Sequence, residues 1–109
     1  MTNAERKIQR LHKRIVNLGP MLPGSISKQW NVCGTPGCKC KDPKHPVRHG
    51  PYYQLSFTFG GKSSSMFVSK ENLVEARKRI KRYQQFKTLT KELVLTYIES
   101  VRTSGFRRS

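Results

Sequence analysis

Acidic side chains are scarce in this sequence of 109 residues. It contains 6 aspartates and glutamates against 22 lysines and arginines, and Asp42 is the only acidic residue between Glu5 and Glu71. A two-metal nuclease needs several converging carboxylates, which this distribution does not supply. A serine or cysteine nucleophile with a supporting acid is equally hard to assemble. We therefore expect a protein that is not an enzyme.

Long apolar runs are also absent. No run reaches the length of a membrane-spanning helix, and no leader segment precedes the first predicted helix. We expect an intracellular, cytoplasmic protein with no membrane partner. The length allows one domain, residues 1–109, with a modest hydrophobic core.

Cysteine is limited to three residues, all between Cys33 and Cys40. An odd number does not complete a disulfide framework, and an iron–sulfur cluster usually asks for four cysteines. Three thiolates with a nearby imidazole are instead the ligand set of a tetrahedral Cys₃His zinc site. The sequence therefore predicts that Cys33, Cys38 and Cys40 bind Zn²⁺. Reactive thiols beside Lys39 and Lys41, or inert loop cysteines, are the alternatives.

Two histidines follow the cysteines, and either could be the fourth zinc ligand. His49 begins the segment His49-Gly50-Pro51-Tyr52, in which glycine and proline would fix the exit of the loop into a strand. His45 lies between Lys44 and Pro46 in a run of mixed charge that is typical of solvent. We favour His49 and keep His45 as the alternative.

The formal net charge is +16, with a sequence pI near 10.5. Such an excess repels itself unless a polyanion is present, so nucleic acid, either DNA or RNA, is the expected partner. The charge is spread along the chain, and Arg77 to Arg82 is its densest run. A basic surface that is merely solvated, or one that meets an anionic membrane, is the weaker reading.

The pattern predicts an α+β fold. Apolar residues at intervals of three and four predict a helix over 3–18, behind the capping-box pattern that starts at Thr2. The metal loop and a β-hairpin occupy 27–69, with strands over 52–59 and 62–68 joined at Gly60-Gly61, and a third short strand over 27–32. A long helix over 70–101, capped by Ser69, precedes a basic tail at 103–109. A break or bend is expected near 88–90, and whether the helix is continuous stays open.

Candidate nucleic-acid-binding residues follow from this arrangement. They lie beside the metal loop, on the hairpin and on the basic part of the long helix. The set is Lys28, Lys39, Lys41, Tyr52, Lys62, Arg77, Lys78, Lys81 and Arg82. Cationic side chains would contact phosphates, and Tyr52 would stack on a base.

Several motifs occur here in an order that resembles a family of small uncharacterised bacterial and archaeal proteins, some of which lie near mobile-element genes. The motifs are Met21-Leu22-Pro23-Gly24-Ser25, the cysteine cluster, His49-Gly50-Pro51-Tyr52-Tyr53 and Gly60-Gly61-Lys62. The resemblance covers roughly residues 21 to 90. It implies that Cys33, Cys38, Cys40 and His49 belong together.

Two functions remain open at this point. The first is a zinc-stabilised, non-catalytic nucleic-acid-binding protein, part of a larger nucleoprotein complex of the nucleoid or of a ribonucleoprotein particle. The second is an interaction subunit of a mobile-element or ribonucleoprotein assembly, in which the apolar stripe of the long helix forms a homodimer or docks on a protein partner.

Overall fold

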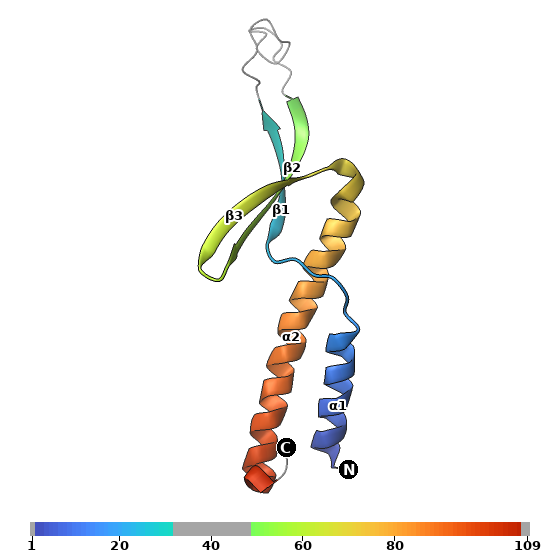
Figure 1. Cartoon of the computed structure of the whole chain (residues 1–109), viewed down its shortest axis with the longest axis vertical. Helices are drawn as coiled ribbons and strands as arrows, with labels where there is room; N and C mark the ends of the chain where they lie inside the picture. Colours follow the sequence, from blue (N-terminus) through green and yellow to red (C-terminus); the bar gives the residue numbers. More distant parts are fainter. Residues whose placement is uncertain (1, 32–48, 108–109) are drawn as a thin grey trace, which may run out of the picture. The chain divides into compact units, whose positions relative to one another are not determined.

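A computed structural model describes residues 2–31 and 49–107 and confirms the α+β class (Figure 1). Its elements are helix α1 (Asn3–Val16), strands β1 (Ser25–Asn31), β2 (His49–Phe59) and β3 (Lys62–Val68), the 3-10 helix η2 (Lys70–Asn72), helix α2 (Leu73–Ser104) and the 3-10 helix η3 (Gly105–Arg107). The chain divides into two compact units. The helical unit comprises Met1–Leu22 and Arg79–Ser109, and the sheet unit comprises Pro23–Lys78.

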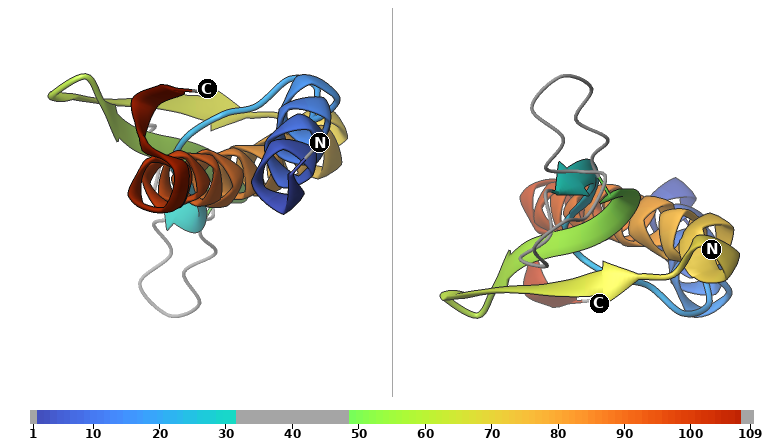
Figure 2. Two further views of the ribbon diagram at one scale, coloured as in Figure 1. Left: turned by 90° about the horizontal axis from the view of Figure 1, so that it is seen from below. Right: turned by 90° about the horizontal axis from the view of Figure 1, so that it is seen from above.

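In the helical unit, α1 lies antiparallel beside α2 (Figures 1 and 2). Helix α1 starts where predicted, because the side chain of Thr2 accepts a hydrogen bond from the backbone N–H of Glu5 at 3.1 Å. Leu11 of α1 and Leu89 of α2 are buried. The apolar stripe read from the first helix is therefore a packing face, as expected.

The connector after α1 is fastened to α2 by two hydrogen bonds. The backbone N–H of Leu22 donates to the carbonyl oxygen of Arg79 at 3.0 Å. The Arg82 guanidinium donates to the carbonyl oxygen of Pro20 at 3.2 Å. Arg82 thus has a structural role that its place in a basic run did not indicate.

Helix α2 runs from Leu73 to Ser104 without interruption, so it contains no break at 88–90, and the continuity that the sequence left open is decided by the structure. Threonine hydroxyls can compete with a helix for backbone hydrogen bonds. Instead, the hydroxyl of Thr88 donates to the carbonyl of Gln84, and that of Thr90 to the carbonyl of Phe86 at 2.8 Å. Each hydroxyl is satisfied by the preceding turn, which leaves the helix continuous.

The sheet unit holds three antiparallel strands in the order β1-β2-β3. The third strand, β1, is therefore present, although it starts at Ser25 rather than at 27. Gly60 and Gly61 form the turn between β2 and β3 with φ angles of 59° and 78°, as the predicted hairpin requires. The turn sets the register in which Phe59 pairs with Lys62 and Leu55 with Met66.

The two faces of the sheet differ in burial, as their alternation predicts. On one face of β2, Leu55 is 1% exposed, and Tyr53 and Phe57 are half-buried. On the other face, Tyr52, Ser56 and Thr58 are exposed. Leu55 is thus the centre of the apolar side of this unit.

The ladder between β1 and β2 is irregular near Pro51. Gln29 pairs with Tyr52, but Asn31 pairs with His49, so β2 has one more residue than β1 in this interval. Proline has no N–H to donate to a ladder, which is why a bulge accommodates it here. Because the pairing resumes beyond the bulge, β2 extends back to His49, three residues before the predicted start of the strand.

Other boundaries and side chains differ in detail. Ser69 is the N-cap residue of η2, but its side chain makes no capping hydrogen bond. Its carbonyl oxygen accepts a hydrogen bond from the backbone N–H of Asn72 instead. Helix α2 reaches Ser104, so residues 103 and 104 belong to it and not to a tail. Trp30, the one tryptophan of the sequence, has a side chain that is about half exposed.

Candidate functional site

Of the predicted zinc ligands, only His49 lies within the described residues. It begins β2 and pairs with Asn31 at the end of β1. Cys33, Cys38, Cys40 and the alternative ligand His45 lie outside the described residues, as do Lys39 and Lys41. Within 2–31 and 49–107, no group of three histidine, cysteine, aspartate or glutamate side chains could hold a metal. The Cys₃His site stays a prediction.

Most of the predicted phosphate contacts in the described part are exposed. Lys28 lies on β1, Lys62 opens β3, and three more lie on α2: Arg77, Lys78 and Lys81. All five cationic side chains are exposed to solvent, so each can contact the phosphates of a polyanion. Arg82 is half-buried and bonded to the connector, so its contact with phosphate stays a prediction.

Lys28 lies beside an exposed aromatic ring. Its ammonium is 5.7 Å from the centroid of the Trp30 ring, within the range of a cation–π contact. Both side chains project from the same face of β1, since they are two residues apart in a strand. The pair offers a positive charge and a flat apolar surface next to each other.

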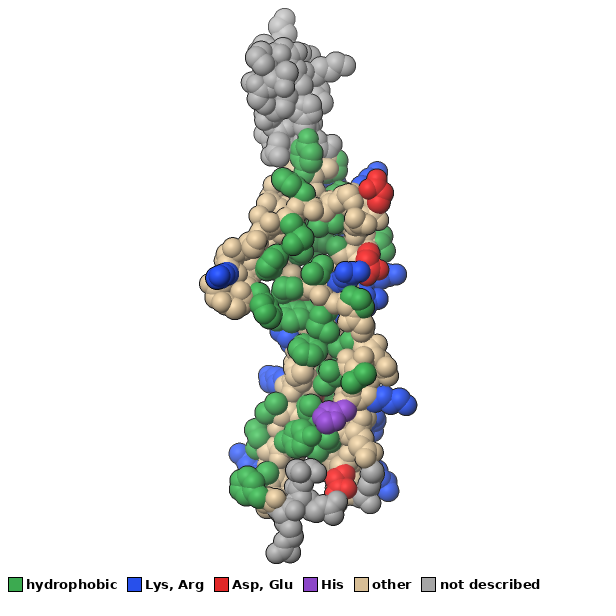
Figure 3. All heavy atoms as spheres, in the orientation of Figure 1, with side chains coloured by type: hydrophobic (Ala, Val, Ile, Leu, Met, Phe, Trp, Pro, Cys, Tyr) green, Lys and Arg blue, Asp and Glu red, His purple; other side chains and the backbone are tan. Residues whose placement is uncertain are grey.

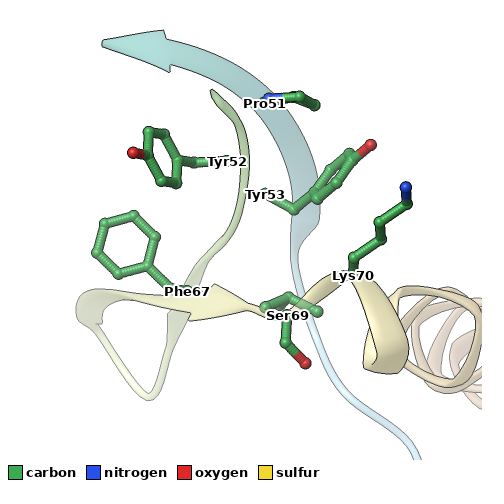
Figure 4. Close-up of a pocket in the computed structure, with 7 residues that line it drawn as sticks. Pro51, Tyr52, Tyr53, Phe67, Ser69 and Lys70 are labelled. Atoms are coloured by element: carbon green, nitrogen blue, oxygen red, sulfur yellow. The ribbon is translucent and has the colours of Figure 1, made fainter. Parts of the chain in front are cut away.

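A pocket of about 600 Å³ opens in the sheet unit, where β3 ends (Figure 4). Strand β3 leaves the ladder after Val68, which pairs with Tyr53, whereas β2 continues to His49. The lining residues are Pro51, Tyr52, Tyr53, Phe67, Val68, Ser69 and Lys70. The pocket therefore combines three aromatic rings with one ammonium group, and it has the size of a small-molecule site.

Two of these rings point the same way from neighbouring strands. The centroids of Tyr52 and Phe67 are 6.5 Å apart, with the rings inclined by 62°. Figure 4 shows both rings on one side of the pocket, and Tyr53 and Lys70 on the other. Tyr52 is 40% exposed and Phe67 is 71% exposed, so both rings meet solvent.

A second, smaller concavity lies in the helical unit. It measures about 240 Å³ and is lined by Arg14 of α1 and Lys81 of α2, with Gln84, Gln85 and Glu92 among its other lining residues. Two cations from different helices thus meet in one groove. A guanidinium and an ammonium group can both donate charge-assisted hydrogen bonds to an anionic oxygen.

Charge changes along the long helix. Residues 70–88 hold seven basic and two acidic residues, whereas residues 89–106 hold two of each. In the second segment, Val94, Leu95 and Ile98 are exposed. A groove of about 550 Å³ there, lined by Ala4, Lys7 and Leu95 among others, separates the first turns of α1 from the last turns of α2. Figure 3 shows apolar side chains along these two helices with basic ones at the sides.

Arg14, Phe67 and Lys70 are among the lining residues of the 600 Å³ pocket and the 240 Å³ concavity that the predicted site did not include. Phe67 could have been found from the two-residue turn at Gly60-Gly61, because the register that this turn sets pairs Phe67 with Gln54 and places it on the face of Tyr52. Arg14 could not, since its proximity to Lys81 depends on how α1 packs on α2. Lys70 reaches the pocket only because η2 follows β3 directly.

The described part of the chain contains no helix that is both long enough and apolar enough to cross a membrane. Comparison with curated proteins found no match, and comparison with solved structures found none. A family described as a domain of unknown function (DUF6788) matches residues 1–79. The matched segment contains α1, the three strands, the cysteine cluster and the start of α2. Since this is most of its length, the chain belongs to the DUF6788 family.

Proposed function

We propose that this protein is a zinc-stabilised, non-catalytic nucleic-acid-binding protein. The observation that carries the proposal is the excess of exposed cations in both units. In the sheet unit these are Lys28, Lys62, Lys70, Arg77 and Lys78; in the helical unit they include Arg6, Arg10, Lys13, Arg14 and Lys81. Few carboxylates oppose them, and one of these, Glu92, is in an ion pair with Lys7 at 3.5 Å.

A bound polyanion would relieve the electrostatic repulsion among these cations. Cations that replace the counterions of a nucleic acid gain the entropy of the released ions, and the gain grows with the number of phosphates contacted. Surface carboxylates would oppose this approach, and the sequence has only 6. The same shortage of carboxylates supports a binding role rather than hydrolysis. Such a protein would associate with the nucleoid or with a ribonucleoprotein particle.

The register of the sheet supports the proposed zinc ligands. Asn31 and His49 form the last pair of the β1–β2 ladder within the described residues, and Cys33 follows Asn31 by two residues in the sequence. Two residues span at most about 7 Å, so chain length alone keeps the first cysteine within about 7 Å of Asn31, the residue that pairs with His49. A zinc ion held by Cys33, Cys38, Cys40 and His49 would have four protein ligands and no open position, which is typical of a structural site. Zinc bound there would add its binding free energy to folding.

The salt dependence of binding tests the proposal. Affinity for duplex DNA, duplex RNA and single strands is measured by fluorescence anisotropy between 50 and ~300 mM salt, with heparin as a competitor. We expect log K to fall linearly with log salt. Lys78→Gln and Lys81→Gln should each lower the slope by about 0.9, because each removes one phosphate contact.

The matched control is Lys91→Gln, on the same helix but beside Glu92 in its charge-neutral part. It should leave the slope unchanged. A preference for one nucleic acid that survives ~150 mM salt would identify the partner class. If none of the nucleic acids binds at 50 mM salt, or if all three variants lower the slope equally, the proposed interface is wrong.

A second candidate function rests on the apolar end of α2. Val94 and Leu95 are each 55% exposed, and the segment 89–106 has no net charge. A second copy of this +16 chain could approach here without the repulsion that it meets elsewhere. The second candidate is therefore a helix-mediated interaction subunit that forms a homodimer, with nucleic-acid binding as an auxiliary property.

Sedimentation equilibrium tests whether the protein forms this homodimer or is a monomer. If the second half of α2 forms the dimer, Ile98→Asp should raise its dissociation constant by about tenfold or more, because a carboxylate would be buried without a partner. Gln84→Asp is the control, since it adds the same charge to the basic half of the helix. A protein that sediments as a monomer across micromolar concentrations would exclude the homodimer.

A further inference from the structure

One face of the sheet, which we term the uncharged face, stands apart from the rest of the protein. It is defined by the residues that alternate with Leu55 and its neighbours and by their cross-strand partners. They are Ser25, Ser27 and Gln29 on β1, Tyr52, Gln54, Ser56 and Thr58 on β2, and Ser63, Ser65 and Phe67 on β3. None of these residues is charged, although 26% of the chain is. Eight of them are exposed, and Gln29 and Gln54 are half-buried.

Hydrogen bonds hold the polar side chains of this face in place. The amide of Gln29 donates to the hydroxyl of Ser27 at 3.3 Å, and the amide of Gln54 donates to the hydroxyl of Ser65 at 3.0 Å. The hydroxyls of Thr58 and Ser63 are 2.7 Å apart. Each of these groups keeps further donors or acceptors for another molecule. The face is thus an ordered row of amides and hydroxyls without ionic groups.

Two aromatic rings stand on this polar row. Phe67, at 71% exposed, has no polar atom that would explain its contact with water, and Tyr52 lies beside it. Their inclination of 62° leaves a face of the Phe67 ring that the Tyr52 ring does not cover. Exposed aromatics on a sheet, surrounded by polar hydrogen-bonding groups, are the arrangement on which unpaired bases stack.

The pocket beside these rings adds a cation. Lys70 lines the same 600 Å³ space as Tyr52 and Phe67, on the side opposite their rings (Figure 4). A nucleotide has a flat base and an anionic phosphate at its other end. The pocket offers aromatic surface and an ammonium group in the matching places, so its charge is complementary to this ligand.

We propose that the uncharged face binds an unpaired nucleobase, which stacks on Phe67 and Tyr52 while Lys70 contacts the adjoining phosphate. The partner is then single-stranded nucleic acid, whose bases are free to leave the stack. This inference rests on the proposed nucleic-acid-binding function and names the form that the protein recognises. Gln29, Gln54 and Ser65 are placed to hydrogen-bond the edges of neighbouring bases.

An abasic strand isolates stacking from charge. Anisotropy is measured on zinc-loaded, full-length protein with three probes of equal length: a single strand, the same strand without bases, and the duplex. Stacking contributes enough per base that we expect the single strand to bind about tenfold more tightly than the abasic strand. Phe67→Ser should remove that ratio, and Phe67→Tyr should keep it.

The control is Met66→Ser, at the neighbouring position of β3 but on the opposite face, where Met66 is 48% exposed. It should retain the ratio. Thermal unfolding checks that each variant folds; if Phe67→Ser does not, Phe67→Leu keeps an apolar side chain that cannot stack.

The possible failures are distinct. Binding to none of the probes would overturn the proposed function itself. Equal binding to the base-containing and abasic strands, a stronger affinity for the duplex, or an unchanged ratio in both Phe67→Ser and Phe67→Leu would overturn only the stacking site. In those cases phosphate contact would account for the binding.

Discussion

Cys38→Ser is expected to abolish stable zinc binding and to weaken nucleic-acid binding. Loss of groups that only orient a zinc ligand lowers metal affinity about 10–100-fold, so loss of a direct thiolate ligand should cost more than about 100-fold. Wild-type protein should bind one zinc ion per chain, measured by mass spectrometry of the native protein and by competition with a chelator. Chelation of the wild type should reproduce the variant.

The two histidines provide a matched pair for this experiment. His49→Asn should lower zinc affinity like the cysteine variant, whereas His45→Asn should leave it unchanged. The reverse result would assign His45 as the fourth ligand. A Cys38→Ser protein that still binds zinc with wild-type affinity, or that binds nucleic acid normally without any metal, would contradict a structural zinc site.

Gly24→Ala is expected to destabilise the sheet unit by about 2–5 kcal/mol. Gly24 has a φ angle of 101°, which is a strained conformation for any residue with a Cβ atom. A Cβ atom there would also collide with the carbonyl oxygen of Ser56 and lie 2.8 Å from Cβ of Phe57. The backbone of β2 is hydrogen-bonded to a strand on each side, so it cannot move away from the new Cβ atom without a loss of stability. Chemical denaturation followed by circular dichroism measures the loss.

Gly60→Ala is the control for backbone strain alone. Gly60 also has a positive φ angle, 59°, but no atom lies within 4 Å of the position that a Cβ would occupy. This variant should lower the free energy of unfolding by only about 1 kcal/mol. Equal losses in the two variants would show that φ strain, and not the close approach of β1 to β2, makes glycine necessary at position 24.

The elements that sequence predicted well are those whose cause is local. Thr2 caps α1 because a hydroxyl three residues before Glu5 can reach its N–H. Gly60-Gly61 fixes the hairpin, because only glycine readily adopts two successive positive φ angles. Alternation placed Leu55 inside and Tyr52 outside, since the period of a strand is two. For the same reason, Phe67 could have been assigned to the exposed face.

The expectations that the structure did not bear out concern polar side chains whose hydrogen-bond partners sequence patterns do not reveal. Thr88 to Thr90 predicted a break in the long helix, but hydroxyl groups that bond to the previous turn do not interrupt it. Arg82 was read from its charge alone, whereas the carbonyl of Pro20, 62 residues away, holds its guanidinium. Neither outcome can be read from composition, because each depends on which partner a polar group finds once the chain folds.

The sequence by itself determined the α+β class, the order of the elements, the excess of positive charge and the residues that could ligate zinc. Local propensity, period and residue chemistry are sufficient for each of these. Only the tertiary structure placed Lys70 in one pocket with Tyr52 and Phe67, and Arg14 in one groove with Lys81. Those groupings depend on where β3 ends relative to β2 and on how α1 packs on α2, and such distances between separate segments are fixed by folding.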